Sequence, residues 1–418
     1  MGGFDSFHYA VSVSNTSTEV ASITITQGAN TLATQNVPAA SAAVIPLPWT
    51  ALRTATGATT MLTSGAYRLR SNQPVTVYQF NPLEYCVGGY CSYSNDASLL
   101  LPVNAWGTKY MVASRNTWEW NGFNLPGFYT VVARKDGTSV TLAPSATGAS
   151  VRAGAGVPGN GVATITLNTG DALQVVSGTP ISADLTGTLV TADQPIEVFG
   201  GHACTFVPAS TPACDHLEES MFPVPTLSTE YIVSPPSLPT MTTPKAFFVR
   251  IVAVEAVTAL QYDPPNAGWP SMLANAGDYV EIDSASDFKV KSDKRILVSQ
   301  YMKSQQAGGN SGDPAMALAV TTGQFRKDYL FHSPVNYENN YVNITAPMGT
   351  QVTLDGQPVA AQFNAVGATG FGVARLMFPN GGDGNHRITA SEKFGITVYG
   401  YGQYTSYWYP GGLNLTDL

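Results

Sequence analysis

The sequence predicts an all-β protein of four pseudo-repeats of about 100 residues, and three observations lead to this prediction. First, a strand-like phrase, which reads Gln-Pro-Val-Thr-Val-Tyr-Gln-Phe in its first copy, occurs at residues 73–80, 194–201, 294–301 and 394–401. Second, apolar and polar residues alternate through most of the chain, which is typical of half-buried strands, and almost no segment has helical periodicity. Third, 40 Gly and 28 Pro supply the turns that many short strands require.

Each unit can be written as a series of strands that closes with the repeated phrase. It opens with a strand led by a tyrosine, continues with a hairpin and a Gly-led strand, and ends with the Pro-Val-x-Val strand, whose proline lies at a strand start. The four leading tyrosines are Tyr9, Tyr110, Tyr231 and Tyr329. The predicted units are residues 1–108, 109–229, 230–327 and 328–418. We expect the first unit to be truncated at its N-terminus, and we interpret residues 1–3 as a remnant of expression.

The size of the units and the composition of their junctions predict how they pack. Six or more strands in about 100 residues fit a β-sandwich. No junction is rich in Ser, Gly or charge, so β-sandwich-like units packed as one body are the favoured arrangement. A propeller-like or toroidal closure of the four units is the alternative.

Composition and charge predict an exported protein that binds no nucleic acid. Only 11% of the residues are charged, whereas soluble domains average about 25%. The net charge is −8 and the 20 Lys and Arg residues are scattered, so the sequence lacks the basic patch that nucleic-acid binding requires. No run of 18 apolar residues occurs, so we expect no membrane span. We interpret the chain as an extracellular or cell-surface protein of bacterial composition.

The four cysteines fall into two close pairs, Cys86 with Cys91 and Cys204 with Cys214. Neither pair has the spacing of a zinc site. Each pair follows shortly after a copy of the repeated strand, which predicts two local disulfides that pin exposed loops. Disulfides are typical of exported proteins. Reduced thiols are the alternative.

Several segments resemble the IgGFc-binding N-terminal domain family. The matching segments are residues 71–80, 95–102, 193–204, 214–219 and 401–412. The likeness covers nearly the whole chain and is most specific over residues 193–223. Members of this family occur in the mucus-associated Fc-gamma-binding protein of animals and in many bacterial surface proteins. The resemblance therefore implies an extracellular binding or adhesion role, but it identifies no set of binding residues.

Acidic and histidine side chains crowd near the second cysteine pair. They are His202, Asp215, His216, Glu218 and Glu219. As a site they could form a metal cluster or an acid–base pair, and Asp215 with Glu218 would serve a carbohydrate-active hydrolase. We favour a structural role, in which Asp215 caps a short helical turn and Glu218 completes a capping box. No metal or cofactor is predicted; calcium at the oxygen-rich loops around Asp96, Asp313 and Asp383 is a weaker alternative.

Loop aromatics are the favoured binding candidates, because they give a large contact area at low entropy cost and stack on sugars and peptides. Together with His202 and His216, the candidate ligand-binding residues are Tyr85, Tyr90, Tyr93, Trp118, Trp120, Tyr407 and Trp408. The alternative for the aromatic residues is packing against neighbouring units.

Taken as a whole, the sequence predicts a recognition or adhesion module that is not an enzyme. The loops after the repeated strands would gather at one face and contact a glycoprotein, a mucin-like glycan or another cell-surface protein. The sequence contains no Gly-x-Ser-x-Gly elbow and no phosphate-cradling loop. Two alternatives stay open, namely a secreted carbohydrate-active hydrolase and a structural subunit of a surface assembly.

Overall fold

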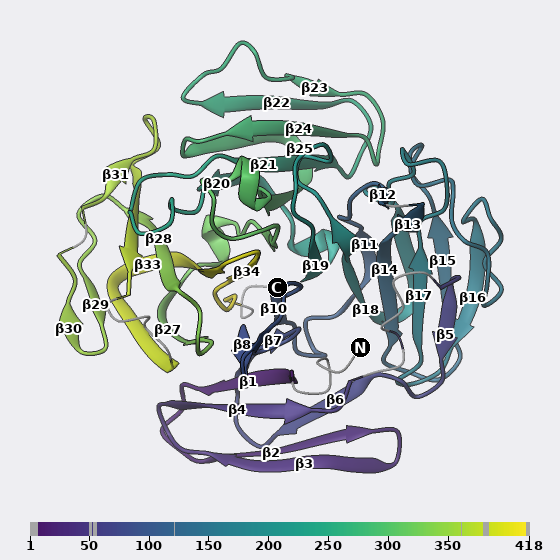
Figure 1. Cartoon of the computed structure of the whole chain (residues 1–418), viewed down its shortest axis with the longest axis horizontal. Helices are drawn as coiled ribbons and strands as arrows, with labels where there is room; N and C mark the ends of the chain where they lie inside the picture. Colours follow the sequence, from purple (N-terminus) through teal and green to yellow (C-terminus); the bar gives the residue numbers. More distant parts are fainter. Residues whose placement is uncertain are drawn as a thin grey trace.

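The computed structural model consists almost entirely of β-strands (Figure 1). It describes residues 7–49, 52, 57–120, 122–360, 362–378 and 384–414. The helical segments among these residues are three short 3₁₀ helices, η2 (Val224–Thr226), η3 (Gln305–Ala307) and η4 (Thr322–Gln324). The prediction of an all-β fold is confirmed.

The strands fall into four groups along the chain, here called the first to fourth groups. The first group contains β1 (Tyr9–Asn15), β2 (Ala21–Gln27), β3 (Asn30–Val37), β4 (Ser41–Leu47), β5 (Thr60–Leu62), β6 (Tyr67–Ser71), β7 (Thr76–Phe80), β8 (Cys86–Val87), β9 (Tyr90–Cys91) and β10 (Ala97–Leu100). The second contains β11 (Gly107–Met111), β12 (Trp118–Trp120), β13 (Phe123–Leu125), β14 (Gly127–Ala133), β15 (Thr138–Ala143), β16 (Ala163–Leu167), β17 (Ala172–Val176), β18 (Leu189–Thr205) and β19 (Asp215–Ser220).

The third and fourth groups complete the chain. The third contains β20 (Ser228–Val233), β21 (Phe247–Ala253), β22 (Thr258–Asp263), β23 (Met272–Leu273), β24 (Tyr279–Ser284), β25 (Phe288–Met302) and β26 (Met316–Leu318). The fourth contains β27 (Arg326–Ser333), β28 (Asn339–Pro347), β29 (Val352–Leu354), β30 (Gln357–Pro358), β31 (Asn364–Ala365), β32 (Phe371–Met377), β33 (Gly384–Gly402) and β34 (Thr405–Pro410).

Alternation of apolar and polar residues places these strands as the sequence predicts. In β15, Thr138, Val140 and Leu142 are buried, and the residues between them are more exposed. Successive side chains of a strand point to opposite faces of the sheet, so this alternation buries one face and leaves the other towards solvent.

The second, third and fourth groups share one order of strands. The orders are β16-β15-β18-β14-β17, β23-β22-β25-β21-β24 and β30-β29-β33-β28-β32. In the second group, the first part of the long strand β18 pairs with β11 and β15, and its second part pairs with β14 and β19. The long strand therefore belongs to two layers and curls the sheet into a sandwich-like unit.

The first group departs from this pattern. It forms two separate sheets, β10-β7-β1-β4 and β3-β2-β6, so β6 and β7 together take the place of one long strand. Tyr9 lies in β1, which pairs with β7 and β4 as β14 pairs with β18 and β17. The interpretation of Tyr9 as a leading tyrosine is therefore wrong. The division of the chain into four units at the predicted boundaries stays a prediction.

The other three leading tyrosines each bridge a β-bulge in the same way. Each hydroxyl accepts a hydrogen bond from the N–H three residues earlier and donates one to a carbonyl in the middle of the long strand. The pairs of partners are Gly107 and Ile196 for Tyr110, Ser228 and Ile296 for Tyr231, and Arg326 and Phe394 for Tyr329. The register of the ladder shifts at each of these places. The hydroxyl thus satisfies backbone groups that the bulge removes from the ladder.

One short strand from each group lies at the centre of the molecule. These inner strands are β10, β19, β26 and β34, and each contacts the next around the centre, with β34 returning to β10. Figure 1 shows the four groups arranged around them. The placement of the groups around the centre thus agrees with the alternative prediction, a toroidal closure. The curling of the individual sheets agrees with the sandwich-like prediction.

Replacing one bridging tyrosine tests the role of its hydroxyl. Tyr231→Phe keeps the ring but leaves the Ser228 N–H and the Ile296 carbonyl without this partner. We expect the free energy of unfolding to fall by about 1–3 kcal/mol in urea denaturation. Tyr90→Phe, at an exposed tyrosine, is the matched control and should leave stability unchanged. Equal stability of both variants would show that the bulge needs no such bridge.

Candidate functional site

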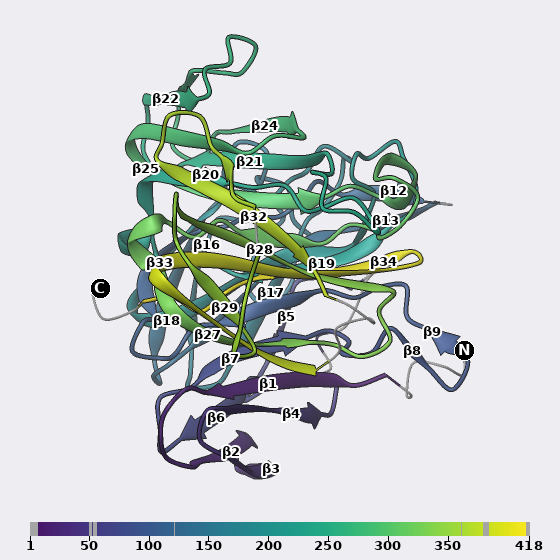
Figure 2. The same cartoon turned by 90° about the vertical axis from the view of Figure 1, so that its left-hand side faces the viewer.

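Four loops meet at one end of the molecule and form the candidate site, here called the loop face. They are residues 81–95, 206–214, 303–313 and 403–404, and each joins a strand of the repeated phrase to the inner strand of the same group. Figure 2 shows β8, β9 and the turn between β33 and β34 at the right-hand side of the molecule. The prediction that these loops gather at one face therefore agrees with their placement.

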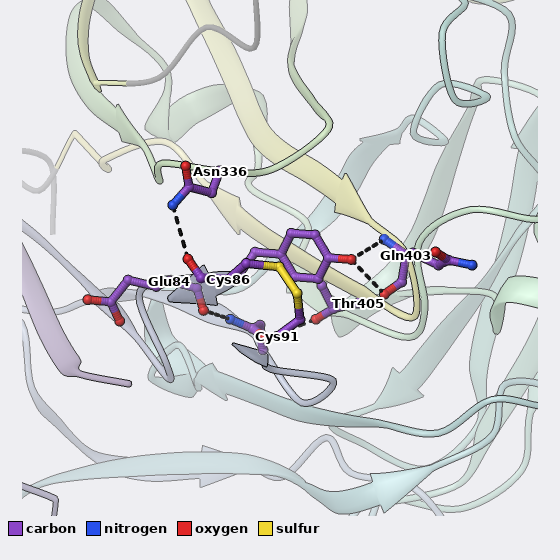
Figure 3. Close-up of a disulfide and its surroundings, with 8 residues drawn as sticks. Glu84, Cys86, Cys91, Asn336, Gln403 and Thr405 are labelled. Carbon is purple, nitrogen blue, oxygen red and sulfur yellow. Dashed lines mark hydrogen bonds between the residues drawn. A yellow bond between two sulfur atoms is a disulfide. The ribbon is translucent and has the colours of Figure 1, made fainter. Parts of the chain in front are cut away.

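Direct hydrogen bonds join neighbouring loops. The Ser304 N–H donates to the Val207 carbonyl at 2.7 Å, and the Tyr404 N–H donates to Gln305 Oε1 at 2.7 Å. The Tyr85 hydroxyl accepts from the Gln403 N–H at 3.0 Å and donates to the Gln403 carbonyl at 3.2 Å (Figure 3). Each loop is thereby held by a loop from another group.

Two disulfides close the first two of these loops. Cys86 is bonded to Cys91 across the β8–β9 hairpin, and Cys204 is bonded to Cys214 at the two ends of the second loop. Asn336 Nδ2 also donates to the Cys86 carbonyl at 3.1 Å (Figure 3). Both predicted pairings are confirmed.

The exposed surface of the loop face is rich in tyrosine and carries little charge. Tyr90, Tyr93 and Tyr404 are 62%, 55% and 37% exposed, and the rings of Tyr93 and Tyr404 lie edge to face with their centroids 6.2 Å apart. The three charged side chains of these loops are Glu84, Lys303 and Asp313. Glu84 and Lys303 are largely covered and paired with His8 and Asp283, and Asp313 is buried.

Several predicted binding residues are buried instead. Tyr85 and Trp118 are each 7% exposed, and the Trp118 ring packs on Phe206 with centroids 4.1 Å apart. Tyr407 and Trp408 are fully buried in β34. Tyr85, Tyr407 and Trp408 contact residues of other groups, namely Gln403, Phe80 and Phe247, whereas Trp118 packs within the second group. Trp120 lies in β12, but its side chain is outside the described part.

The two candidate histidines have local structural contacts. His202 is fully buried; its Nδ1 accepts from the Cys204 N–H at 3.1 Å, and its Nε2 lies 3.0 Å from the Asn116 carbonyl and donates to it. Burial lowers the pKa of His202 to about 3, so the ring is neutral and its hydrogen is on Nε2. The half-buried His216 stacks on Phe128, and its Nε2 lies 3.1 Å from Asn81 Nδ2.

Beneath the loop face, the carboxylate of Asp96 connects all four inner strands. Its Oδ1 accepts from the N–H groups of Ala97 in β10 at 2.9 Å and of Trp408 in β34 at 3.3 Å. Its Oδ2 accepts from the N–H groups of Glu218 in β19 and Met316 in β26, both at 3.1 Å. Asp96 is fully buried. One side chain therefore satisfies main-chain donors from four different groups.

Other buried carboxylates add connections between the same strands. Asp215 Oδ2 accepts from the Thr405 hydroxyl at 3.2 Å, and Glu219 Oε2 accepts from the Leu318 N–H at 3.4 Å. Asp313 Oδ1 accepts from the Gln305 N–H at 3.0 Å, which ties η3 to the end of the loop that contains it. None of these carboxylates takes part in an ion pair within the described ranges.

The predicted helix cap at Asp215 is wrong, because Asp215 is the first residue of strand β19. Its Oδ1 accepts from the next N–H, that of His216, at 2.7 Å, which is a strand-start contact. Asp215 is fully buried and Glu218 is 7% exposed, so their placement gives no support to a hydrolase. Among the residues described, no cluster of three His, Cys, Asp or Glu side chains could hold a metal ion. Asp96 and Asp313 serve main-chain donors, and Asp383 lies outside the described residues.

Burial strongly perturbs the titration of this carboxylate cluster. It raises the pKa of Glu218 to about 7 and that of Asp313 to about 7. It also raises the pKa of Asp215, an effect that the neighbouring Asp313 and Asp96 increase. Lys245 is buried as well, and burial lowers its pKa to about 7.

Tyr404 is exposed on the loop face. The sequence alone does not separate it from the buried aromatics of β34, because strand alternation cannot show where the turn before β34 lies. Tyr404 has a φ of 60° in that turn, directly after the last copy of the repeated strand. Its position relative to that strand, which matches that of the cysteine loops, is the signal that could have found it.

Comparison with known proteins finds one family for most of the chain. A family model described as "IgGFc binding protein" matches residues 96–400. The human "IgGFc-binding protein" is 24% identical over 323 residues, which is 75% of this chain but 6% of the human protein. A solved anti-sigma factor domain-containing protein from Clostridium clariflavum covers 96% of this chain and 99% of its own, with 8% identity and a TM-score of 0.12, which is too low to support any argument. No helix in the described ranges is long and apolar enough to cross a membrane.

Asp96→Ala tests whether the four inner strands depend on one carboxylate. The substitution leaves four buried N–H groups without this acceptor. Each such loss costs about 1–3 kcal/mol, so we expect stability to fall by more than about 3 kcal/mol in chemical denaturation. Glu255→Ala, at an exposed carboxylate, is the control. A loss of less than about 1 kcal/mol in the Asp96 variant would contradict this role.

Glu218→Gln tests the titration of the cluster. The folded-state pKa of about 7 exceeds the ordinary value of 4.5, so the folded protein holds this proton more tightly than the unfolded chain does. The resulting stabilisation is fully present below pH 4.5 and is lost as the pH rises through 7. Relative to the wild type, the Gln variant should therefore gain stability between about pH 5 and pH 8, by on the order of 3 kcal/mol.

Urea denaturation at several pH values measures this difference, with Glu255→Gln as the control. A difference between the Glu218 variant and the wild type that stays the same across the range would show that Glu218 titrates normally.

Proposed function

Because the chain belongs to the IgGFc-binding protein family, we propose that it is an extracellular, non-enzymatic module that binds a glycoprotein through its loop face. The observation that carries this proposal is the joining of four loops, two of them closed by disulfides, beneath exposed tyrosines from two groups. Loops that are already ordered lose little conformational entropy on binding, so their contacts contribute more fully to affinity.

The composition of the loop face supports a macromolecular partner. Tyr90, Tyr93 and Tyr404 provide rigid amphipathic contact area. The neighbouring loop residues include many Gly, Ser, Asn and Gln, among them the exposed Ser210, Gln306 and Asn310. The same mixture of tyrosine with small and amide side chains is used by antibody binding loops. With so few free charges, we expect binding that depends only weakly on salt.

The partner that we favour is a secreted or cell-surface glycoprotein, bound in an adhesion or capture role. The name of the human relative refers to immunoglobulin Fc, so Fc is a natural first ligand to test on this chain. The matching region is 6% of that relative, and for this reason mucins and other glycoproteins belong in the same test.

The test is binding of the oxidised protein to immobilised Fc and mucin by surface plasmon resonance. For the ligand that binds, Tyr93→Ala combined with Tyr404→Ala should weaken affinity at least about tenfold, because exposed aromatic anchors commonly contribute more than 1 kcal/mol each. Val162→Ala, at an exposed apolar residue of another region, is the control and should bind normally. Reduction of both disulfides should also weaken binding.

Saturable binding that survives both the double tyrosine variant and reduction would place the ligand site elsewhere on the molecule. Self-association of the protein without binding to any glycoprotein would favour the structural-subunit alternative.

A further inference from the structure

We propose that the outer edge of β24 is a docking site for an extended segment of a partner protein, which adds to the third group as an extra strand. The proposal starts from a difference between equivalent strands. In the second group, the outer edge of β17 pairs with β5, and in the fourth group the outer edge of β32 pairs with β31. In the third group, β24 is the last strand of its sheet along the described chain. An unpaired edge is a template for strand addition.

The same Gly-Asp pair precedes β17 and β24. Gly170 and Gly277 both have a positive φ, of 79° and 82°. Asp171 Oδ2 accepts from the Asn168 N–H at 2.8 Å, and Asp278 Oδ2 accepts from the Asn275 N–H at the same distance. The two strand starts are therefore built alike.

Only one of the two aspartates holds a docked segment. Asp171 Oδ1 accepts from the Ser64 N–H at 2.9 Å, and Ser64 follows β5, so this carboxylate fastens β5 to the second group. No hydrogen bond to Asp278 Oδ1 is found among the described residues. Asp278 thus offers the acceptor that Asp171 uses.

The main-chain groups of β24 also point to the open edge. The Ala253 N–H in β21 donates to the Asp278 carbonyl at 2.9 Å. Because the direction of these groups alternates along an antiparallel strand, those of Tyr279, Glu281 and Asp283 point away from β21. The equivalent residues in β17 include Ala172 and Gln174, which pair with β5.

Exposure agrees with this difference between the two edges. Glu281 and Asp283 in β24 are exposed, whereas Gln174 in β17 is half-buried and Val176 is buried. The β17 edge is thus covered, and the β24 edge is open to solvent.

A groove of ≈ 530 Å³ lies beside the start of β24 and gives room for the end of the added strand that pairs with Tyr279. One wall is residues 145–147 of the second group, and the other is residues 272–274 and 277–280 of the third group. Met272 at its rim is 59% exposed. At Gly277 the second and third groups touch, because Gly187 abuts that residue so closely that a Cβ on Gly187 would lie 1.9 Å from the Gly277 carbonyl oxygen. The docked strand therefore pairs with residues 279–283.

The composition of β5 and the charges along β24 indicate what kind of segment would bind at this edge. The strand docked on β17, Thr60–Leu62, is uncharged. Glu281 and Asp283 already form ion pairs with Arg115, Arg250 and Lys303, whereas Asp278 forms none within the described residues. The fitting partner is an uncharged extended segment with a Lys or Arg beside it, placed to reach Asp278.

Hydrogen exchange of the whole protein tests this proposal. The probe is a capped peptide with the sequence of residues 58–66 followed by lysine, which reproduces the docked segment and the basic neighbour. At saturating peptide we expect the amides of residues 279, 281 and 283 to exchange at least about tenfold more slowly. The amides of β17 should not change, because β5 already covers them.

Two variants at one position provide a matched comparison. Asp283→Pro removes an N–H that points to the open edge and makes no bond to β21, and proline is tolerated at such edge positions. Asp283→Ala removes the same carboxylate but keeps the N–H. We expect the Pro variant to bind the peptide about five- to tenfold more weakly than the Ala variant, the effect of one net hydrogen bond. Ala146→Trp, at an exposed residue of the groove wall, should abolish binding by filling the groove.

Equal binding by the two Asp283 variants, or protection at β17 in place of β24, would overturn the proposal. Protection of residues 279–283 that rises with protein concentration in the absence of peptide would identify a second copy as the occupant and would also overturn it. The proposal does not depend on the loop face: the double variant at Tyr93 and Tyr404 should bind the peptide as the wild type does.

Discussion

The whole arrangement depends on how the centre of the molecule satisfies its main-chain hydrogen-bonding groups. Four inner strands from four groups meet there, and each has donors that its own sheet cannot satisfy. Asp96 accepts from all four strands, and Asp215 and Glu219 add further cross-connections. A carboxylate is suited to this role because it is an acceptor only and has several lone pairs. The raised pKa values of Glu218 and Asp313 show the cost of removing these carboxyl groups from water.

The loop face follows from this centre. Each loop begins at a strand of the repeated phrase and ends at the inner strand of the same group. Because these two strands pair with each other, fixing the four inner strands also fixes both ends of the four loops. Hydrogen bonds such as the one from Ser304 to Val207 and the two disulfides then order the parts between. Tyr90, Tyr93 and Tyr404 are left exposed on a rigid base. The loop face is therefore made by four segments that are far apart in sequence, and no single group contains it.

Sequence alone predicted the parts of the fold that local chemistry determines. Alternation and turn residues gave the strands, the repeated phrase located β7, β18, β25 and β33, and cysteine spacing gave both disulfides. It could not predict the partners of Asp96, which lie 122, 220 and 312 residues away. For the same reason it mistook Asp215 for a helix cap. It could not tell the buried Trp408 from the exposed Tyr404 either, because inner strands are covered on both faces and lose the alternation that marks exposure.

The position of β34 has a consequence for biosynthesis. This strand is the last of the described strands, yet it supplies the Trp408 N–H to Asp96 and the Thr405 hydroxyl to Asp215. A nascent chain that has not yet released β34 from the ribosome leaves the central acidic groups incompletely bonded and one loop missing. Contacts across such long sequence separations form slowly. The loop face thus reaches its full set of four loops only after β34 has left the ribosome.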